Sequence, residues 1–335
     1  MTAQSDFKNI VRERQQKTGE SYTTARSHVM RARAALLGLP EPTPTPAADP
    51  HLDAVVLKVN ERSARVRIFG EAAEVTFKSS DACDLVPGHI ASLKLTKRWT
   101  WRGNAYANGS VASTVLDVAR LGLVALPLED GDLLDARELY EPHRAPDPYA
   151  PLWRKLTSRP RPAFQFDPIA WGAFPGEDAE ESAACRASEL LGAGDEDGAR
   201  ELLMDVLHRD LRCIDAHGHL GNLEFDRNPD GALLHYEVGI AIGELSLPRG
   251  FDGFLPWNRL YNRPFLRCLH GYALCLWRLG RAREAQLVFE RILSLNPNDN
   301  QGVRVCWNDL REGRTWEDGE ARDAKEEAER RLGLQ

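Results

Sequence analysis

Residues 265–299 constrain the fold more than any other segment, because they carry the pattern of two amphipathic helices joined at Gly280. Pro297 is predicted to end the second helix. A helix pair with one apolar face cannot bury that face alone, so it must stack on further helices or hold a partner. The sequence therefore predicts a stack of helices in this part of the chain, with a surface suited to binding.

A weaker form of the same pattern extends over residues 178–335. Ala199, Ala232 and Ala285 each lie near the start of a predicted helix, and each precedes an aromatic residue or leucine by four positions. The intervals between these alanines are 33 and 53 residues. The longer interval corresponds to one repeat plus an insert at 243–263, where prolines and glycines interrupt the helical pattern.

The unit at 265–299 resembles a tetratricopeptide repeat, a family with a period of about 34 residues. The resemblance rests on small residues where two helices touch, on an aromatic residue and on a closing proline. The matching positions in this unit are Ala273, Gly280, Ala285, Phe289 and Pro297, and Ala199 and Ala232 match in the two units before it. It implies a right-handed helical stack whose concave groove holds a peptide. Residues 217–297 also resemble a group of uncharacterised bacterial repeat proteins, a resemblance that implies no activity.

Residues 51–115 carry a different pattern, which predicts a small β-barrel. Strands are expected at 54–59, 64–69, 74–77, 90–96 and 105–115, and the second and third alternate apolar with polar residues. Five short strands favour a closed barrel, because closure leaves no exposed edge. The turn at 86–90, Val-Pro-Gly-His-Ile, resembles the turn before a strand in oligonucleotide-binding and S1-like barrels.

The other segments complete the prediction of an α+β multidomain chain. Residues 1–39 predict a basic helical hairpin with seven Lys or Arg against three acidic residues. Residues 40–50 hold five prolines and predict an extended linker. Residues 116–177 are rich in proline and aromatic rings, and we expect them to drape over both neighbours. Short helical turns are expected within this segment at 133–140 and 152–156.

Composition and charge narrow the functional classes. No apolar run approaches the roughly 18 residues that span a bilayer, and the first residues lack the apolar core of a signal peptide. We therefore expect a cytoplasmic protein with no membrane partner. The net charge of -7 is uneven, with 16 Lys and Arg against 11 Asp and Glu in residues 1–113 and 27 against 39 in the remainder. The basic part suits an anionic partner, although solvated surface explains the same charges.

No motif indicates catalysis, a cofactor or a metal. The six cysteines are scattered without a CxxC pair, and no phosphate-binding or nucleophile motif occurs. His217 and His219 are the closest histidine pair, but residues two apart on a helix point about 200° apart and cannot chelate one ion. A metal-dependent hydrolase would need Asp215 and Glu224 to complete a site through the fold.

A cluster of basic and aromatic residues is the strongest functional signal outside the repeats. It consists of Lys97, Arg98, Trp99, Trp101, Arg102 and Tyr106. Strand alternation places Lys97 and both tryptophans on one face, and the two arginines on the other. Stacking of single-stranded bases on such rings contributes about 1–3 kcal/mol per base. The alternative is that the tryptophans fill the barrel or seat the proline-rich segment.

Residues in and after the insert are the candidate peptide contacts. They are Trp257, Arg259, Asn262, Arg263, Arg267 and His270. The three arginines recur every four residues and would recognise a carboxylate if they face the groove. The insert itself is interpreted either as a lid over the groove or as an aromatic plug between repeats.

These patterns favour a non-enzymatic adaptor that holds a protein or peptide in a tetratricopeptide-like groove. The second hypothesis is binding of RNA or another single-stranded nucleic acid through the barrel, with phosphate contacts from the basic hairpin. The third is the metal-dependent hydrolase at the His217 and His219 region.

Overall fold

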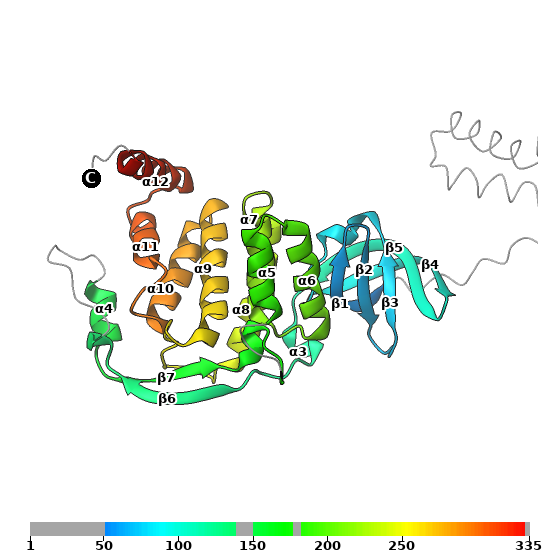
Figure 1. Ribbon diagram of the computed structural model, residues 1–335, viewed down its shortest axis with the longest axis horizontal. Helices are drawn as coiled ribbons and strands as arrows, with labels where there is room; N and C mark the ends of the chain where they lie inside the picture. The colour runs from blue at the N-terminus through cyan, green and yellow to red at the C-terminus, as the bar shows by residue number, and fades with distance from the viewer. Residues whose placement is uncertain (1–50, 139–149, 177–181, 332–335) are drawn as a thin grey trace, which may run out of the picture. The chain divides into compact units, whose positions relative to one another are not determined.

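The computed structural model describes residues 51–138, 150–176 and 182–331 (Figure 1). Within these ranges the chain is an α+β protein with a closed five-stranded β-barrel followed by a helical region. The hairpin predicted at 1–39 and the linker predicted at 40–50 lie outside the described residues. None of the described helices is both long enough and apolar enough to cross a membrane.

The barrel strands follow the order β1-β2-β3-β5-β4, with β4 returning to pair with β1. Their bounds are β1 Leu52–Asn60, β2 Ser63–Ile68, β3 Glu74–Lys78, β4 Ile90–Trp101 and β5 Asn104–Val115. The alternation seen in the sequence sets the register, because Val66 pairs with Val75 and both point into the barrel core with Phe77. The prediction of a five-stranded barrel is confirmed.

β4 and β5 form a longer ribbon than the sequence pattern indicated. Each contains 12 residues, and Trp101 pairs with Asn104 next to the tight turn at Arg102 and Gly103. Gly103 has a φ of +81°, a conformation that suits glycine because it has no Cβ. The basic and aromatic cluster therefore lies on the distal half of this ribbon.

The helical region consists of consecutive antiparallel helices. Their bounds are α5 Ala183–Gly192, α6 Glu196–Arg209, α7 Ile214–Phe225, α8 Pro229–Ser246, α9 Arg263–Arg278, α10 Ala282–Leu295, α11 Val303–Arg311 and α12 Trp316–Arg331. Each helix from α5 to α10 packs on the next, and α7 also packs on α9. Figure 1 shows the row of helices leading away from the barrel, beginning with α6 beside β1.

The three alanines of the sequence pattern occupy equivalent places. Ala199, Ala232 and Ala285 are each the fourth residue of the second helix of a pair, in α6, α8 and α10. All three side chains are fully buried. A methyl group at these positions lets the paired helices approach closely.

Tyr236 of α8 fixes the contact between α7 and α9. A Cβ added at Gly221 would lie 2.6 Å from its ring, and one added at Gly271 would also collide with it. The Tyr236 hydroxyl donates a hydrogen bond of 2.6 Å to Asn222 Oδ1. The two glycines therefore make room for a ring that joins three successive helices.

The connecting segment differs from the expectation at one point. Residues 133–134, predicted to start a helical turn, belong to strand β6 (Leu128–Leu134), which pairs with β7 (Arg161–Phe166). The expected turn at 152–156 lies within helix α4 (Ala150–Leu156). Figure 1 shows the β6–β7 ribbon crossing the ends of the helices, where Phe166 packs edge-on against Phe265 of α9.

The insert begins later than predicted and its centre is buried. Helix α8 continues to Ser246, so the irregular part starts at Leu247. Phe254 and Leu255 are fully buried, and the Phe254 amide donates to the carbonyl of Pro162 at 2.8 Å. Its centre is held between the β6–β7 ribbon and helix α10, because the Leu255 amide donates to the Leu295 carbonyl at 2.8 Å.

Candidate functional site

A cavity of about 400 Å³ opens between α7, α8 and α9, next to the loop that precedes α11. It is lined by Asn222, Phe225, Tyr236, Arg267, His270, Gly271, Leu274 and Gln301. Helical periodicity produces this wall, because residues 267, 270, 271 and 274 lie on one side of α9. Two of the predicted peptide contacts, Arg267 and His270, therefore reach one cavity.

Arg267 lies beside two tryptophan rings. Its guanidinium carbon is 5.5 Å from the Trp171 ring centroid and 5.6 Å from the Trp257 ring centroid. It meets Asp215 at 3.5 Å, and Asp215 is also 3.4 Å from His219. Among the described residues this long contact is the only hydrogen bond that Arg267 makes, while its side chain is 37% exposed. Most of its donors are left for another acceptor.

His270 and Gln301 place polar atoms without partners at the same cavity. Gln301 Nε2 lies 3.4 Å from His270 Nδ1, but the buried His270 Nε2 and Gln301 Oε1 have no partner among the described residues. Burial lowers the pKa of His270 from 6.5 to about 4, so the ring is neutral at neutral pH. Buried polar atoms in this state are satisfied by water or by a polar ligand.

The other predicted peptide contacts divide into two groups. Arg263 lies against Trp257, with Nε donating to the Trp257 carbonyl at 3.0 Å and its guanidinium carbon 5.3 Å from the ring centroid. Arg259 packs its guanidinium on Gly131 of β6, away from the cavity lining. Trp257 and Arg263 thus extend the surface around Arg267, whereas Arg259 does not.

The expected role of Asn262 is corrected by its burial. Its side chain is fully buried, Nδ2 donates to the carbonyls of Phe164 and Pro256, and Oδ1 accepts from the Phe166 amide at 3.1 Å. The amide joins the β6–β7 ribbon to the insert and is not accessible to a peptide.

The basic and aromatic residues of the ribbon cover its outer surface. Trp99 stacks on Tyr106 with ring centroids 5.4 Å apart, and Lys97 and Lys78 approach these rings at 5.4 and 5.6 Å. Trp101 is 56% exposed, with the Arg102 guanidinium carbon 4.5 Å from its ring centroid. Neither tryptophan belongs to the barrel core cluster.

Arg98 differs from its neighbours because it is already paired. It donates two hydrogen bonds to Glu71, at 2.8 and 2.7 Å, and this pair lowers the pKa of Glu71. No such pairing with a carboxylate is found for Lys78, Lys97 or Arg102 within the described part of the chain. Lys97, Arg102 and the exposed Trp101 therefore lie on the distal half of the ribbon, with Lys78 of β3 beside it.

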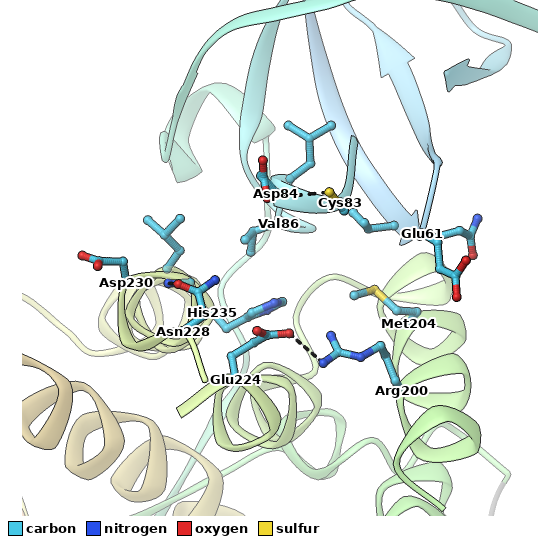
Figure 2. A pocket seen from close by; sticks show the side chains of 15 residues that line it. Glu61, Cys83, Asp84, Val86, Arg200, Met204, Glu224, Asn228, Asp230 and His235 are labelled. Atoms are coloured by element: carbon cyan, nitrogen blue, oxygen red, sulfur yellow. Dashed lines mark hydrogen bonds and ion pairs between the residues drawn. The ribbon is translucent and has the colours of Figure 1, made fainter. Parts of the chain in front are cut away.

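A larger cavity of about 510 Å³ lies where the barrel meets α6, α7 and α8, and Figure 2 shows its lining. Its apolar walls include Leu85, Val86, Met204 and Leu234. Arg200 donates to Glu224 at 2.6 Å on one side. Sequence reasoning missed this site, because its residues come from distant segments that only the packing of barrel on helices brings together.

Three buried histidines lie at the same junction. His89, His217 and His235 are each at most 4% exposed, and the rings of His217 and His235 are 6.4 Å apart. Burial lowers the pKa of His89 and of His217 to about 4, and that of His235 well below 6.5. His217 Nε2 meets the Leu211 carbonyl at 3.1 Å. All three rings are therefore neutral at neutral pH.

The two histidines behind the hydrolase hypothesis point to different places. His217 points into the buried junction, whereas His219 contacts Asp215 and lies 3.4 Å from the Ser188 hydroxyl. Within the described ranges, no group of three or more His, Cys, Asp or Glu side chains is placed to hold a metal ion.

Comparison of the chain with protein-family models, with curated proteins and with solved structures found no significant match.

Proposed function

We propose that the helical region is a tetratricopeptide-like adaptor that holds a peptide bearing a carboxylate. The observation that carries this proposal is Arg267, which lies beside two indole rings at a cavity and makes one long hydrogen bond within the described part of the chain. A guanidinium with donors to spare is suited to bidentate recognition of a carboxylate, and the flanking rings hold its plane in place.

The packing of the helices supports the tetratricopeptide-like part of the proposal. Ala199, Ala232 and Ala285 occupy the same position in three successive second helices and are equally buried. The cavity is lined mainly by the first helices of two pairs, α7 and α9. A stack of this kind presents its first helices along one continuous surface, which suits an extended peptide.

The remaining groups in the cavity suit a peptide backbone. His270 Nε2 and Gln301 Oε1 are buried without partners among the described residues, and both offer hydrogen bonds to a polar ligand. Phe225 and Leu274 supply apolar surface beside them. Asp215 offsets part of the Arg267 charge, so affinity must come from the carboxylate, the backbone contacts and the apolar surface together.

A selection experiment tests the proposal. Short random peptides are selected on the wild-type protein, and enriched peptides are titrated into wild type, Arg267→Ala and Arg283→Ala. Arg283 is exposed on α10 outside the cavity and serves as the matched control. We expect acidic peptides to be enriched, and Arg267→Ala to weaken them by about 2 kcal/mol. Enrichment without carboxylates, or equal binding by Arg267→Ala, would contradict the proposal.

We propose as a second function that the β4–β5 ribbon binds single-stranded nucleic acid. The specific observation is Trp101, which is 56% exposed beside Arg102 and the cation-flanked pair of Trp99 and Tyr106. An exposed indole next to unpaired cations provides a stacking surface and phosphate contacts at once. The barrel order β1-β2-β3-β5-β4 supports it, since oligonucleotide-binding barrels use their β4–β5 loop in binding.

Fluorescence anisotropy with an oligouridylate of about 12 nucleotides tests this function. If three phosphates are contacted, by Lys78, Lys97 and Arg102, the logarithm of the affinity should fall with the logarithm of the salt concentration with a slope of about −2. Trp101→Ala should weaken binding by about 1–3 kcal/mol. Phe69→Ala is the control, because Phe69 is another exposed aromatic residue, at the end of β2 and outside the ribbon. A salt-independent affinity would argue against the ribbon as the binding surface.

A further inference from the structure

We propose that the cavity between the barrel and helices α6, α7 and α8 binds a small organic cation, an amine or guanidinium carried on an apolar skeleton. This site is separate from the groove around Arg267 and does not depend on the function proposed above.

The walls of the cavity select for an apolar body. Leu85, Val86 and Met204 are each at most 4% exposed in the folded chain, and Leu234 lies beside them. The volume of about 510 Å³ is within the range of small-molecule sites. The barrel contributes the first two of these residues and the helices the other two, so a ligand here contacts both parts.

The charges of the cavity select for a cation. Four carboxylates line it, from Glu61, Asp84, Glu224 and Asp230, against the single guanidinium of Arg200. Arg200 is already paired with Glu224 at 2.6 Å. The other three carboxylates have no ion pair within the described part of the chain and lie exposed around the cavity. An anion would meet repulsion from this rim, whereas a cation finds partners.

His235 provides an independent sign that the cavity holds a ligand. The ring is 4% exposed, points into the cavity in Figure 2 and makes no hydrogen bond among the described residues. Because the ring is neutral, one of its nitrogens is an acceptor for the N–H of an ammonium or guanidinium group. The described chain supplies no donor for that nitrogen, so a cationic ligand would complete the site.

The methyl group of Met204 is a direct probe, because Met204 lines the cavity and is the only methionine in the described ranges. The protein is labelled with ¹³C at its methionine methyl groups and titrated with phenethylamine, with 2-phenylethanol and with 3-phenylpropanoate. We expect the Met204 signal to shift in a saturable way with the amine, with about tenfold weaker effects from the neutral and anionic compounds.

Two variants and two controls identify the groups responsible. Asp84→Asn combined with Glu61→Gln should weaken amine binding by about fivefold, while Asp197→Asn, exposed on α6 outside the cavity, should leave it unchanged. His235→Phe should weaken it by about tenfold, with the Met204 spectrum of the free variant checking its fold. Arg267→Ala should have no effect, because that site is separate. Equal shifts from all three compounds, or no shift with the amine, would overturn the proposal.

Discussion

A Cβ atom added at Gly88 would lie 2.8 Å from Cγ1 of Val238, so the barrel turn and helix α8 meet without room for one more carbon. The Gly88 amide donates to the Val56 carbonyl at 2.9 Å, which ties the same turn to β1. Lys58 pairs with Asp205 across this junction, and His208 lies 3.0 Å from Glu74. Barrel and helix α8 are therefore closely packed at this turn.

Gly88→Ala should lower the free energy of unfolding through both backbone strain and this collision. Gly103→Ala is a matched control, because Gly103 also has a positive φ but has no atom near the added Cβ. We expect Gly88→Ala to be the more destabilising of the two by about 1–3 kcal/mol, measured by urea denaturation. Equal effects would show that the junction is looser than described.

The buried histidines make stability depend on pH. The folded pKa values of His89, His217 and His270 are about 4, below the ordinary 6.5, so the unfolded chain binds more protons between these values. The stability that comes from keeping these rings neutral is fully present above about pH 6.5 and is lost as the pH falls toward about 4. Each of these histidines should lower the free energy of unfolding by on the order of 2 kcal/mol when the pH falls from about 7 to about 5.

Replacement of one of these histidines tests whether its protonation causes the loss of stability at low pH. His217→Leu should reduce the loss of thermal stability between about pH 7 and about pH 5, even if the variant is less stable at neutral pH. His51→Leu is the control, since His51 is exposed before β1. If His217→Leu and wild type show the same pH dependence in scanning calorimetry, the titration of this ring does not contribute.

The three equivalent alanines predict equivalent responses to overpacking. Ala199→Leu, Ala232→Leu and Ala285→Leu should each lower the free energy of unfolding by about 1–3 kcal/mol, because each methyl lies in a buried helix crossing. Ala321→Leu on the exposed surface of α12 should change it little. If one of the three buried alanines accepts leucine without cost, the crossings are not equivalent.

Asn262 should behave as a structural residue. Asn262→Leu leaves the Phe166 amide and two carbonyls without their partner inside the protein, at a cost of about 1–3 kcal/mol for each unsatisfied group. A lower urea midpoint with an unchanged slope is expected. If the variant is as stable as wild type but loses peptide binding, the original expectation of a peptide contact is restored.

Patterns within short stretches of sequence predicted the barrel strands and several helices. The alternation at 64–68 and 74–77 gave the barrel strands, and the recurring alanine gave three second helices. β6 was missed because Leu128–Leu134 contains three acidic residues and a glycine, and its partner β7 contains Pro162. Only long-range pairing makes these segments strands.

The candidate sites were also predicted only as far as local sequence patterns allow. The four-residue spacing of Arg259, Arg263 and Arg267 suggested recognition of a carboxylate, but spacing does not say which side chains are buried. The Asn262 side chain, expected to contact a peptide, is fully buried. The junction cavity joins Asp84, Arg200 and His235, which are far apart in the sequence. No local signal marks such a site, because the packing of barrel on helices creates it.

A double-mutant cycle tests the central proposal most directly. The tightest peptide selected on the wild-type protein is compared with a copy in which its acidic residue is replaced by the corresponding amide, and both are titrated calorimetrically into wild type and Arg267→Ala. A direct pair between Arg267 and the peptide carboxylate predicts a coupling energy of at least about 1.5 kcal/mol. Additivity to within about 0.5 kcal/mol would show that Arg267 does not hold the carboxylate and would contradict the adaptor proposal.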